Sequence, residues 1–206
     1  MNTLPPFGDR RRRRVGLLGG SFNPAHEGHR HVSLEALRRL GLDEVWWLVS
    51  PQNPLKSGDG MEPLASRLAR AHEIARDPRI KVEAPELALG TRYTLDTVRA
   101  LKRLYPRAHF VWLMGADILP QLVDWANWRD LFAAIPIAAF ARPGWSHAAL
   151  NSTAPRAFRQ LSHFAFCYFR PEYSIIHTSH SLGGHTTECT STLDCLFSHT
   201  CLVLLM

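Results

Sequence analysis

His26 and His29 stand three residues apart in the stretch GGSFNPAHEGHRH (19–31), between an apolar run and a helical pattern. On the first turn of a helix, side chains with this spacing lie on one face. Their ring N–H groups can then donate to the same anion, while the helix start adds unpaired backbone N–H groups and the positive end of a dipole. These residue types at this spacing predict a phosphate-binding site.

The glycines of this stretch favour a sharp turn after the strand. Without a Cβ, Gly19 and Gly20 let the backbone approach a ligand closely, and Gly28 does the same between the two histidines. The common phosphate-binding spacings G-x-x-x-x-G-K-[ST] and G-x-G-x-x-G cannot be fitted here. The loop therefore belongs to a less common type of phosphate cradle.

Two alternatives compete for the histidines. A zinc site of the H-E-x-x-H kind needs a spacing of four, whereas HEGH has a spacing of three and no obvious third ligand nearby. The side chains could instead be ordinary surface histidines, which is the simplest interpretation of His31. The surrounding glycines and proline favour the phosphate site for His26 and His29.

Short apolar runs alternate with helical periods from residue 15 onward. The pattern predicts strands at 15–20, 44–50, 80–84, 108–115 and 136–144, and helices at 27–40, 63–76, 94–105 and 122–135. Such alternation predicts an α/β fold, a Rossmann-like three-layer sandwich with a mainly parallel sheet and helices on both faces. Ligands bind at the carboxyl ends of such strands, which is where the histidine stretch lies.

Composition indicates a globular protein, because 46% of the 206 residues are hydrophobic and 20% are charged. No apolar run approaches the roughly 20 residues that span a bilayer, so no membrane partner is expected. Of the 24 cationic residues behind the net charge of +6, five form the run 10–14. Such a run is usually solvated, so residues 1–14 are expected to be a flexible basic leader, with no nucleic acid partner.

Cysteines are confined to the C-terminal part of the chain. Residues 1–166 contain none, so the core has no disulfide framework, and we expect a cytoplasmic protein. The arginine-rich leader keeps an organelle transit peptide as a minor alternative.

Several separated motifs resemble those of one family. The stretch 19–29 resembles the signature of the H-x-G-H nucleotidyltransferase superfamily, and specifically that of the nicotinate-nucleotide adenylyltransferases of bacterial NAD biosynthesis. The resemblance covers about residues 15–145. It continues in order through WWLVSPQNPLK (46–56), TRYTLDT (91–97), WLMGAD (112–117), WANW (125–128) and ARPG (141–144).

The resemblance implies an in-line attack by the 5′-phosphate of nicotinate mononucleotide on the α-phosphorus of ATP, which releases pyrophosphate without a covalent enzyme intermediate. The residues agree, since they supply cations, glycines and histidines but no nucleophile beside a base. The implied cofactor is Mg²⁺, bound mainly through ATP phosphates. The sequence leaves a homo-oligomer open.

The resemblance also implies the roles of single residues. The catalytic residues are His26 and His29, which stabilise the ATP phosphates, and Lys56, which neutralises substrate phosphate. The ATP-binding residues are Gly28, Gly115 and Asp117. The substrate-binding residues are Gly19, Gly20, Ser21, Phe22, Thr94, Trp125 and Arg142.

Some of these residues have structural alternatives. Trp125 matches the family's stacking position for nicotinate, and Thr94 the position that receives its carboxylate; yet a tryptophan pair at 125 and 128 is more often core. By spacing alone, Thr94 is predicted to cap the helix at 94–105, and Asp117 to cap a helix from 118 onward. The resemblance implies that Asp117 also faces a ribose. Lys56 alone would be an ordinary loop lysine.

Residues 161–206 depart from this pattern. They contain one arginine, no lysine and three acidic residues, against 23 cationic and 15 acidic residues before them. The domains expected are therefore a nucleotidyltransferase domain at 15–160 and an atypical, poorly ordered segment at 161–206. A shifted reading frame would explain the segment, and a lineage-specific tail is the rival. A zinc site is disfavoured by its spacing; its ligands would be His185, Cys189, Cys195, His199 and Cys201.

The family's C-terminal Ser-Ser-Thr-x-x-Arg type motif is absent from this segment. The nearest string is TSTLDCL (190–196), and Arg170 is the last arginine. Because that arginine would contact the ATP phosphates, one alternative is a catalytically impaired nucleotide-binding remnant. Another is an adenylyltransferase for a different acceptor, such as nicotinamide mononucleotide or phosphopantetheine.

Overall fold

The structure is a computed structural model. It describes residues 4–51, 60–140 and 152–153, and the backbone of residues 165–170, 173–178 and 201–205. The chain divides into two compact units, Met1–Phe110 and Val111–Met206, which are described in turn. Within the described ranges, no helix combines the length and the apolar character that crossing a membrane requires.

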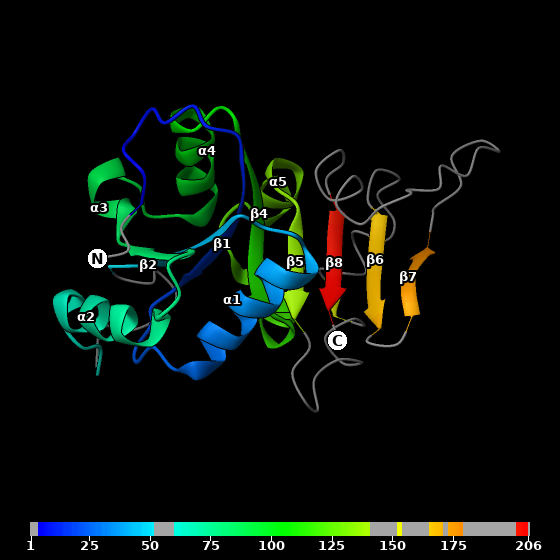
Figure 1. Ribbon diagram of the computed structural model, residues 1–206, viewed down its shortest axis with the longest axis horizontal. Coiled ribbons are helices and arrows are strands. Elements are labelled where there is room, and N and C mark those ends of the chain that lie inside the picture. The colour runs from blue at the N-terminus through cyan, green and yellow to red at the C-terminus, as the bar shows by residue number, and fades with distance from the viewer. Residues whose placement is uncertain are drawn as a thin grey trace. The chain divides into compact units, whose positions relative to one another are not determined.

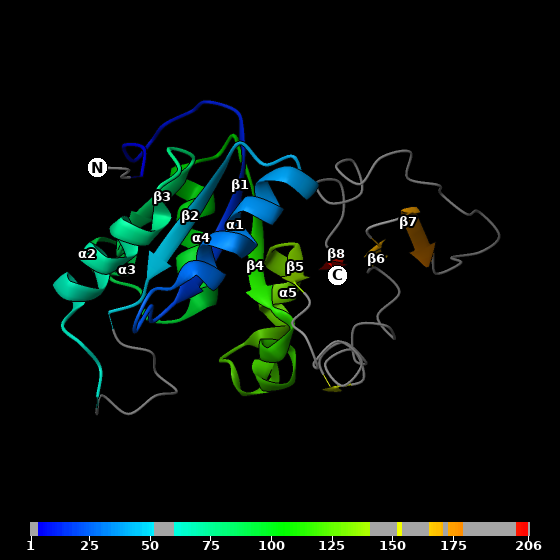
Figure 2. The ribbon, with the colours of Figure 1, turned by 60° about the horizontal axis from the view of Figure 1, so that its bottom comes forward.

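The first unit consists of parallel strands with helices between them (Figure 1). The strands lie in the order β3–β2–β1, with Leu17 of β1 opposite Trp46 of β2. α1 and α2 lie on one side of these strands and α3 and α4 on the other, as Figure 2 also shows. The elements are β1 (Arg13–Gly20), α1 (Glu27–Arg39), β2 (Glu44–Val49), α2 (Leu64–Ala75), β3 (Ile80–Glu83), α3 (Pro85–Leu89), α4 (Thr94–Leu104) and the start of β4 (Ala108–Gly115).

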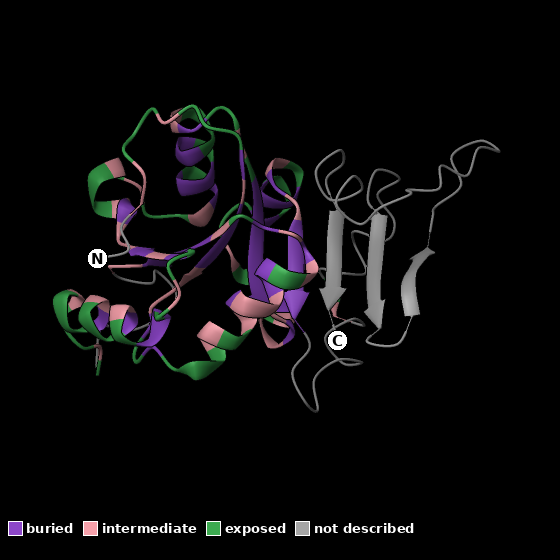
Figure 3. Ribbon diagram, in the orientation of Figure 1, coloured by how far each residue is buried: buried purple, intermediate pink, exposed green. Residues whose placement is uncertain are grey.

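The core of this unit forms because its strands are covered on both faces. Val45 to Val49 of β2 are all buried, on alternating sides, which explains the unbroken apolar run. Figure 3 shows the same burial along β1 and β2. α4 presents Leu95, Val98 and Leu101, spaced three residues apart, as its buried stripe.

The second unit continues the mainly parallel pattern. Its strands lie in the order β4–β5–β8–β6–β7, and all neighbours are parallel except β6 and β7. The predicted α/β fold with a mainly parallel sheet is confirmed. The elements after β4 are the 3-10 helix η1 (Ala116–Asp124), α5 (Trp128–Ala134), β5 (Ile137–Phe140), β6 (Ala165–Arg170), β7 (Tyr173–Thr178) and β8 (Cys201–Leu205).

Two predictions about helices are wrong. A continuous helix over 122–135 is replaced by η1 and α5, because Asn127 adopts a left-handed conformation with φ 54° that interrupts a helix. Thr94 does not cap α4, since the helix already begins at Thr94 and Tyr93 is the N-cap residue. The short α3 was not predicted.

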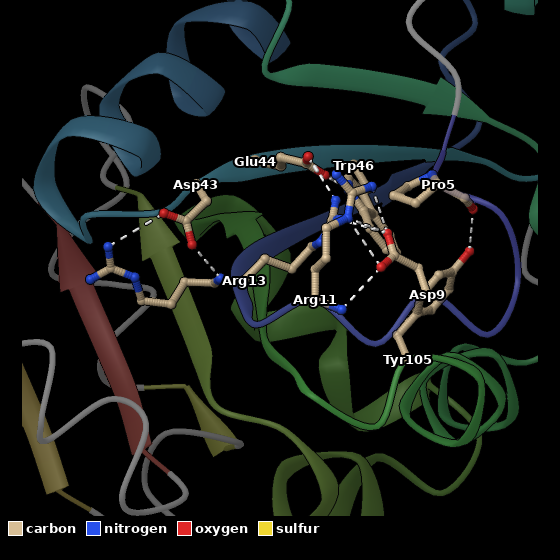
Figure 4. A network of polar contacts seen from close by, with 9 residues as sticks. Pro5, Asp9, Arg11, Arg13, Asp43, Glu44, Trp46 and Tyr105 are labelled. Carbon is tan, nitrogen blue, oxygen red and sulfur yellow. Dashed lines mark hydrogen bonds and ion pairs between the residues drawn. The ribbon is translucent and has the colours of Figure 1, made fainter.

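The arginine run near the N-terminus is partly built into the first unit (Figure 4). Arg13 belongs to β1 and is buried, with its guanidinium 2.6 Å from Asp9 and 2.8 Å from Glu44. Arg11 pairs with the same Asp9 carboxylate at 2.7 Å. The expectation of a solvated run is therefore wrong for Arg13, while Arg10, Arg11 and Arg12 are exposed.

Tyr105 attaches the segment before β1 to the core. Its hydroxyl donates to the Pro5 carbonyl at 2.7 Å, and burial raises the pKa of Tyr105 to about 12. The ring packs edge-on against Trp46 at 5.0 Å. Residues from Pro5 onward are thus held to β2 and α4.

Three described strands, β6, β7 and β8, fall within residues 161–206. β8 pairs in parallel with β5 and β6, so this part of the chain contributes backbone to the sheet. Of the zinc ligands considered from sequence, Cys201 is the first residue of β8. The other four lie outside the described residues.

Candidate functional site

The turn between β1 and α1 follows the carboxyl end of a parallel strand. Gly20 is the last residue of β1, and its carbonyl accepts a hydrogen bond from the Ser50 N–H at 2.9 Å. Phe22 then adopts φ 46°, and His26 is the N-cap residue of α1. The whole connection therefore spans six residues, so the strand end and the helix start lie close together.

The two histidines form a reciprocal cap at the start of α1. Nδ1 of His26 accepts from the Gly28 N–H at 3.1 Å, and Nδ1 of His29 accepts from the His26 N–H at 3.2 Å. The ring centroids are 4.0 Å apart. Because each Nδ1 accepts a hydrogen bond, the proton of a neutral ring lies on Nε2. Both rings are thus oriented by the backbone of the same turn.

Gly28 is required by the position of the His26 ring. A Cβ on Gly28 would lie 2.9 Å from Cε1 and Nδ1 of His26, closer than real Cβ contacts come. Gly28 thus makes room for the cap, and the phosphate expected beside it from the sequence stays a prediction. At Gly20 a Cβ would meet only the Phe22 ring, at an ordinary 3.7 Å.

A buried aromatic pair supports His29. The Phe22 ring stacks on Trp47 at 5.1 Å and lies 4.7 Å from the His29 ring. Trp47 Nε1–H donates to Ser33 Oγ at 2.8 Å, and that hydroxyl donates to the His29 carbonyl at 2.8 Å. Both Trp47 and Ser33 are fully buried. This chain of contacts fixes His29 from its ring and from its backbone.

Sequence reasoning missed Ser33 and Trp47. A polar residue four positions after His29, on the side of α1 where Ala36 and Leu37 are buried, was the available signal. Phe22 was predicted to bind substrate, and its side chain is only 2% exposed. Phe22 therefore offers almost no accessible surface to a substrate.

Arg67 of α2 is a buried cation beside this turn. Its side chain is 1% exposed and donates to four backbone carbonyls at 2.6 to 2.9 Å, which are those of Ser21, Ser50, Pro51 and Glu62. Desolvation lowers the pKa of Arg67 from its ordinary value. Arg67 was also missed, although it shares a helical stripe with the buried Ala71 and Ile74.

Glu86 of α3 is bound to the residue that follows β2. Ser50 Oγ donates to its carboxylate at 2.9 Å, and burial raises the pKa of Glu86. Ser50 thus connects α3, Gly20 and Arg67 through its side chain, N–H and carbonyl.

Thr94 is the first residue of α4 and is half-buried. The preceding Tyr93 is exposed, and its carbonyl accepts from the hydroxyl of Thr97 at 3.3 Å. Thr97 in turn shares a hydrogen bond of 2.8 Å with Thr91. The TRYTLDT stretch therefore forms a hydrogen-bonded helix start, with Thr94 within its first turn.

In the second unit, Gly115 and Asp117 lie where β4 ends. Gly115 is the N-cap residue of η1 and Asp117 is the second residue within it, so the predicted cap by Asp117 for residues 118 onward is wrong. The Asp117 carboxylate occupies the space that a Cβ on Gly115 would take. Gly115 is thus needed for the carboxylate to fold back over the strand end.

The two tryptophans of WANW lie in different environments. Trp128 is buried at the start of α5, with the Arg129 guanidinium 4.4 Å from the centre of its ring. Trp125 is half-buried and meets Trp112 edge-to-face at 6.2 Å. Trp128 therefore has the core role considered from sequence, whereas Trp125 keeps part of its surface open.

Two further residues considered from the sequence, Gly19 and His31, lie in β1 and in α1. Gly19 lies opposite Leu48 within the paired strands. His31 is exposed on α1. Lys56 and Arg142 lie outside the described residues. In the described part of the chain, no three or more His, Cys, Asp or Glu side chains are grouped so as to hold a metal ion.

The model of the cytidylyltransferase-like family matches residues 17–182, which are most of the chain, so the chain belongs to the cytidylyltransferase-like proteins. A probable nicotinate-nucleotide adenylyltransferase of Parvibaculum lavamentivorans is 59% identical over 149 residues, which are 72% of this chain and 74% of the relative. Another, of Bradyrhizobium sp. (strain ORS 278), is 54% identical over 144 residues, 70% of this chain and 75% of the relative. The chain belongs to the nicotinate-nucleotide adenylyltransferase family.

A solved structure supports the fold. Plasmodium falciparum nicotinic acid mononucleotide adenylyltransferase complexed with NaAD has a TM-score of 0.58 to this chain at 18% identity. The match covers 67% of this chain and 70% of that one.

Proposed function

We propose that this chain transfers the adenylyl group of ATP to nicotinate mononucleotide, giving deamido-NAD and pyrophosphate in NAD biosynthesis. The observation that supports it most directly is the capping pair His26 and His29 at the start of α1. The pair occurs in a chain 59% identical to a relative named for this activity.

The geometry suits a transfer that needs positioning and charge stabilisation. An oxygen of the acceptor phosphate forms a bond to the α-phosphorus of ATP, and the bond to pyrophosphate breaks with its electron pair on the leaving oxygen. Negative charge on the phosphate oxygens is stabilised by donors held in place beforehand. We assign this role to Nε2–H of His26 and His29 and to the positive end of α1.

Other roles remain proposals that rest on the sequence resemblance. We assign phosphate binding to the backbone of the turn and to Lys56, and recognition of the nicotinate to Thr94 and Trp125. Mg²⁺ enters with ATP as part of that substrate. The residues assigned to substrate are Gly19, Gly20, Ser21, Phe22, Thr94, Trp125 and Arg142, and those assigned to ATP are Gly28, Gly115 and Asp117.

We also propose a cytoplasmic location and no nucleic acid partner. The lack of cysteine in residues 1–166 supports the location. The pairing of Arg11 and Arg13 with Asp9 supports the proposal that no nucleic acid is bound, because these cations already have anionic partners.

The test measures pyrophosphate release from ATP and nicotinate mononucleotide by the chain and by His26→Asn. Asparagine caps helices well but lacks the Nε2–H donor. We therefore expect unchanged thermal unfolding and a rate about a hundredfold to a thousandfold lower. His31→Asn, at an exposed position on the same helix, serves as the matched control and should keep the full rate. A full rate in His26→Asn would contradict the proposal.

A second candidate is a nucleotide-binding remnant with impaired turnover. The observation in its favour is the absence of any arginine after Arg170, where the family's motif would supply one to ATP. Losing such a donor costs about 3 to 4 kcal/mol of transition-state stabilisation. Calorimetry with both nucleotides separates the candidates, because a remnant binds them without releasing pyrophosphate. Replacing nicotinate mononucleotide by its amide tests the choice of acceptor.

A further inference from the structure

We propose that Arg67 is a positioning residue for the reaction: its guanidinium fixes the backbone of the turn that presents His26 and His29. The part of this proposal that is tested by enzyme activity rests on the proposed function. Arg67 is the fourth residue of α2 and touches neither histidine in the contacts above, so it would act through the turn rather than on a substrate.

The hydrogen bonds of Arg67 join three separate segments of the chain. Nη1 donates to the Ser21 carbonyl at 2.6 Å, directly after β1, and to the Ser50 carbonyl at 2.7 Å, directly after β2. Nη2 donates to the Pro51 carbonyl at 2.8 Å, and Nε to the Glu62 carbonyl at 2.9 Å, just before α2. One planar group thus sets the distances between two strand ends and a helix start.

Burial makes this arrangement costly to disturb. A cation removed from water is tolerated only where hydrogen bonds replace its hydration. All four bonds of Arg67 go to carbonyls, and its side chain is 1% exposed. The guanidinium is therefore held at one position, and the carbonyls with it.

A second attachment lies two residues further along the turn. The Asn23 side chain donates to the Gly60 carbonyl at 3.0 Å and accepts from the Glu62 N–H at 3.1 Å. The turn is thus fixed at Ser21 by the guanidinium of Arg67 and at Asn23 by the side-chain amide of Asn23. Both attachments reach the segment that precedes α2.

Between these attachments lies Phe22, the residue that supports His29. Its left-handed backbone, φ 46°, is unfavourable for a side chain with a Cβ and persists only where neighbours hold it. Its ring lies 4.7 Å from the His29 ring. A shift of the Ser21 carbonyl would therefore move Phe22 and then the imidazole.

Lysine cannot reproduce this arrangement. Its ammonium is a point donor with three N–H groups, whereas arginine presents a planar fork in fixed directions. Arg67→Lys keeps the charge and loses part of the set of four bonds. The matched control is Arg70→Lys, three positions along the same helix. Arg70 is exposed and pairs with Glu73 at 3.0 Å.

The test compares both variants by thermal unfolding, by kcat and KM, and by NMR of the histidine ring signals. We expect Arg67→Lys to unfold cooperatively at a lower temperature, with kcat at least about tenfold lower because small misplacements of reacting groups are costly. KM for nicotinate mononucleotide should change less. The ring signals of His26 and His29 should shift in Arg67→Lys and stay in place in Arg70→Lys.

A different result is expected if Arg67 only stabilises the fold. It would lower the unfolding temperature while kcat of the folded protein and the histidine signals stayed at their wild-type values, and this outcome would overturn the proposal. If Arg67→Lys does not fold, Asn23→Ala decides in its place: we expect a lower kcat and shifted histidine signals, and wild-type values of both would overturn it.

Failure of the proposed function is distinguishable from failure of this inference. A wild-type chain without pyrophosphate release refutes the function and leaves the histidine signals as the readout of positioning. A wild-type chain with turnover and unshifted histidine signals in Arg67→Lys refutes the inference alone.

Discussion

The turn from β1 to α1 and the segment from β4 to α5 both follow the carboxyl end of a parallel strand, yet they are held in different ways. In the first, each histidine ring accepts a hydrogen bond from the backbone of the same turn. In the second, a 3-10 helix leads to two tryptophans placed by contacts with other aromatic or cationic side chains. Polar groups are thus oriented by hydrogen bonds, and flat apolar groups by packing.

Because of this difference, substitutions in the two regions should differ in their effects on activity and on stability. In the turn, small changes reorient donors without removing much buried surface, so activity should respond more than stability. In the β4–α5 segment, removing a buried ring leaves a cavity, so stability should respond more, except at the half-buried Trp125.

The largest expected effect is that of Trp128→Ala. Trp128 is 8% exposed, and truncating a buried tryptophan costs about 3 to 5 kcal/mol in the free energy of unfolding. Trp125→Ala should cost clearly less and should raise KM for nicotinate mononucleotide. Urea unfolding and steady-state kinetics measure both. Equal losses of stability in the two variants would contradict the contrast between the tryptophans.

Gly28→Ala should lower activity without lowering stability. The new Cβ would displace the His26 ring, and misplacing a reacting group by about 1 Å can reduce a rate about a hundredfold. Alanine is also favoured over glycine in a helix by about 1 kcal/mol, which opposes any loss from the cap. Pyrophosphate release and thermal unfolding measure the two effects. The neighbouring exposed Glu27→Ala is the control, and an unchanged rate in Gly28→Ala would disprove the steric argument.

Ser33→Ala should affect stability and activity together. It removes the acceptor of the buried Trp47 N–H, and an unsatisfied buried donor costs about 1 to 3 kcal/mol. It also frees the His29 carbonyl from its side-chain donor, so a modest fall in kcat is expected. Chemical unfolding and kinetics test this, with the exposed Ser66→Ala as the control. Unchanged stability would show that Trp47 Nε1–H finds another acceptor.

The smallest effect concerns Asp9 and depends on pH. The hydrogen bond from Arg11 lowers the pKa of Asp9 from 3.8 to about 2. Because the folded pKa lies below the unfolded one, the stabilisation is present above pH 3.8 and is lost as the pH falls through about 2. Asp9→Asn should therefore be less stable than wild type at pH 5, and the difference should shrink from below pH 3.8 and vanish only below about pH 2. A difference that does not shrink between pH 5 and pH 2 would speak against this ion pair.

The two regions also differ in how far the sequence predicted them. The β1–α1 turn could be predicted because glycines, N-cap residue and histidine spacing all act within a few residues. The break at Asn127 was missed, although asparagine adopts the left-handed conformation more readily than most residues. Arg67 was missed because its partners are backbone carbonyls, which carry no signature in the residue types around them.

The buried guanidinium makes tolerance to substitution very uneven. Its acceptors belong to the main chain, so exchanging a side chain at an acceptor residue removes none of the four hydrogen bonds of Arg67, whereas any change of the arginine removes at least one. A saturation library should thus find Arg67 nearly immutable and the acceptor positions Pro51 and Glu62 permissive.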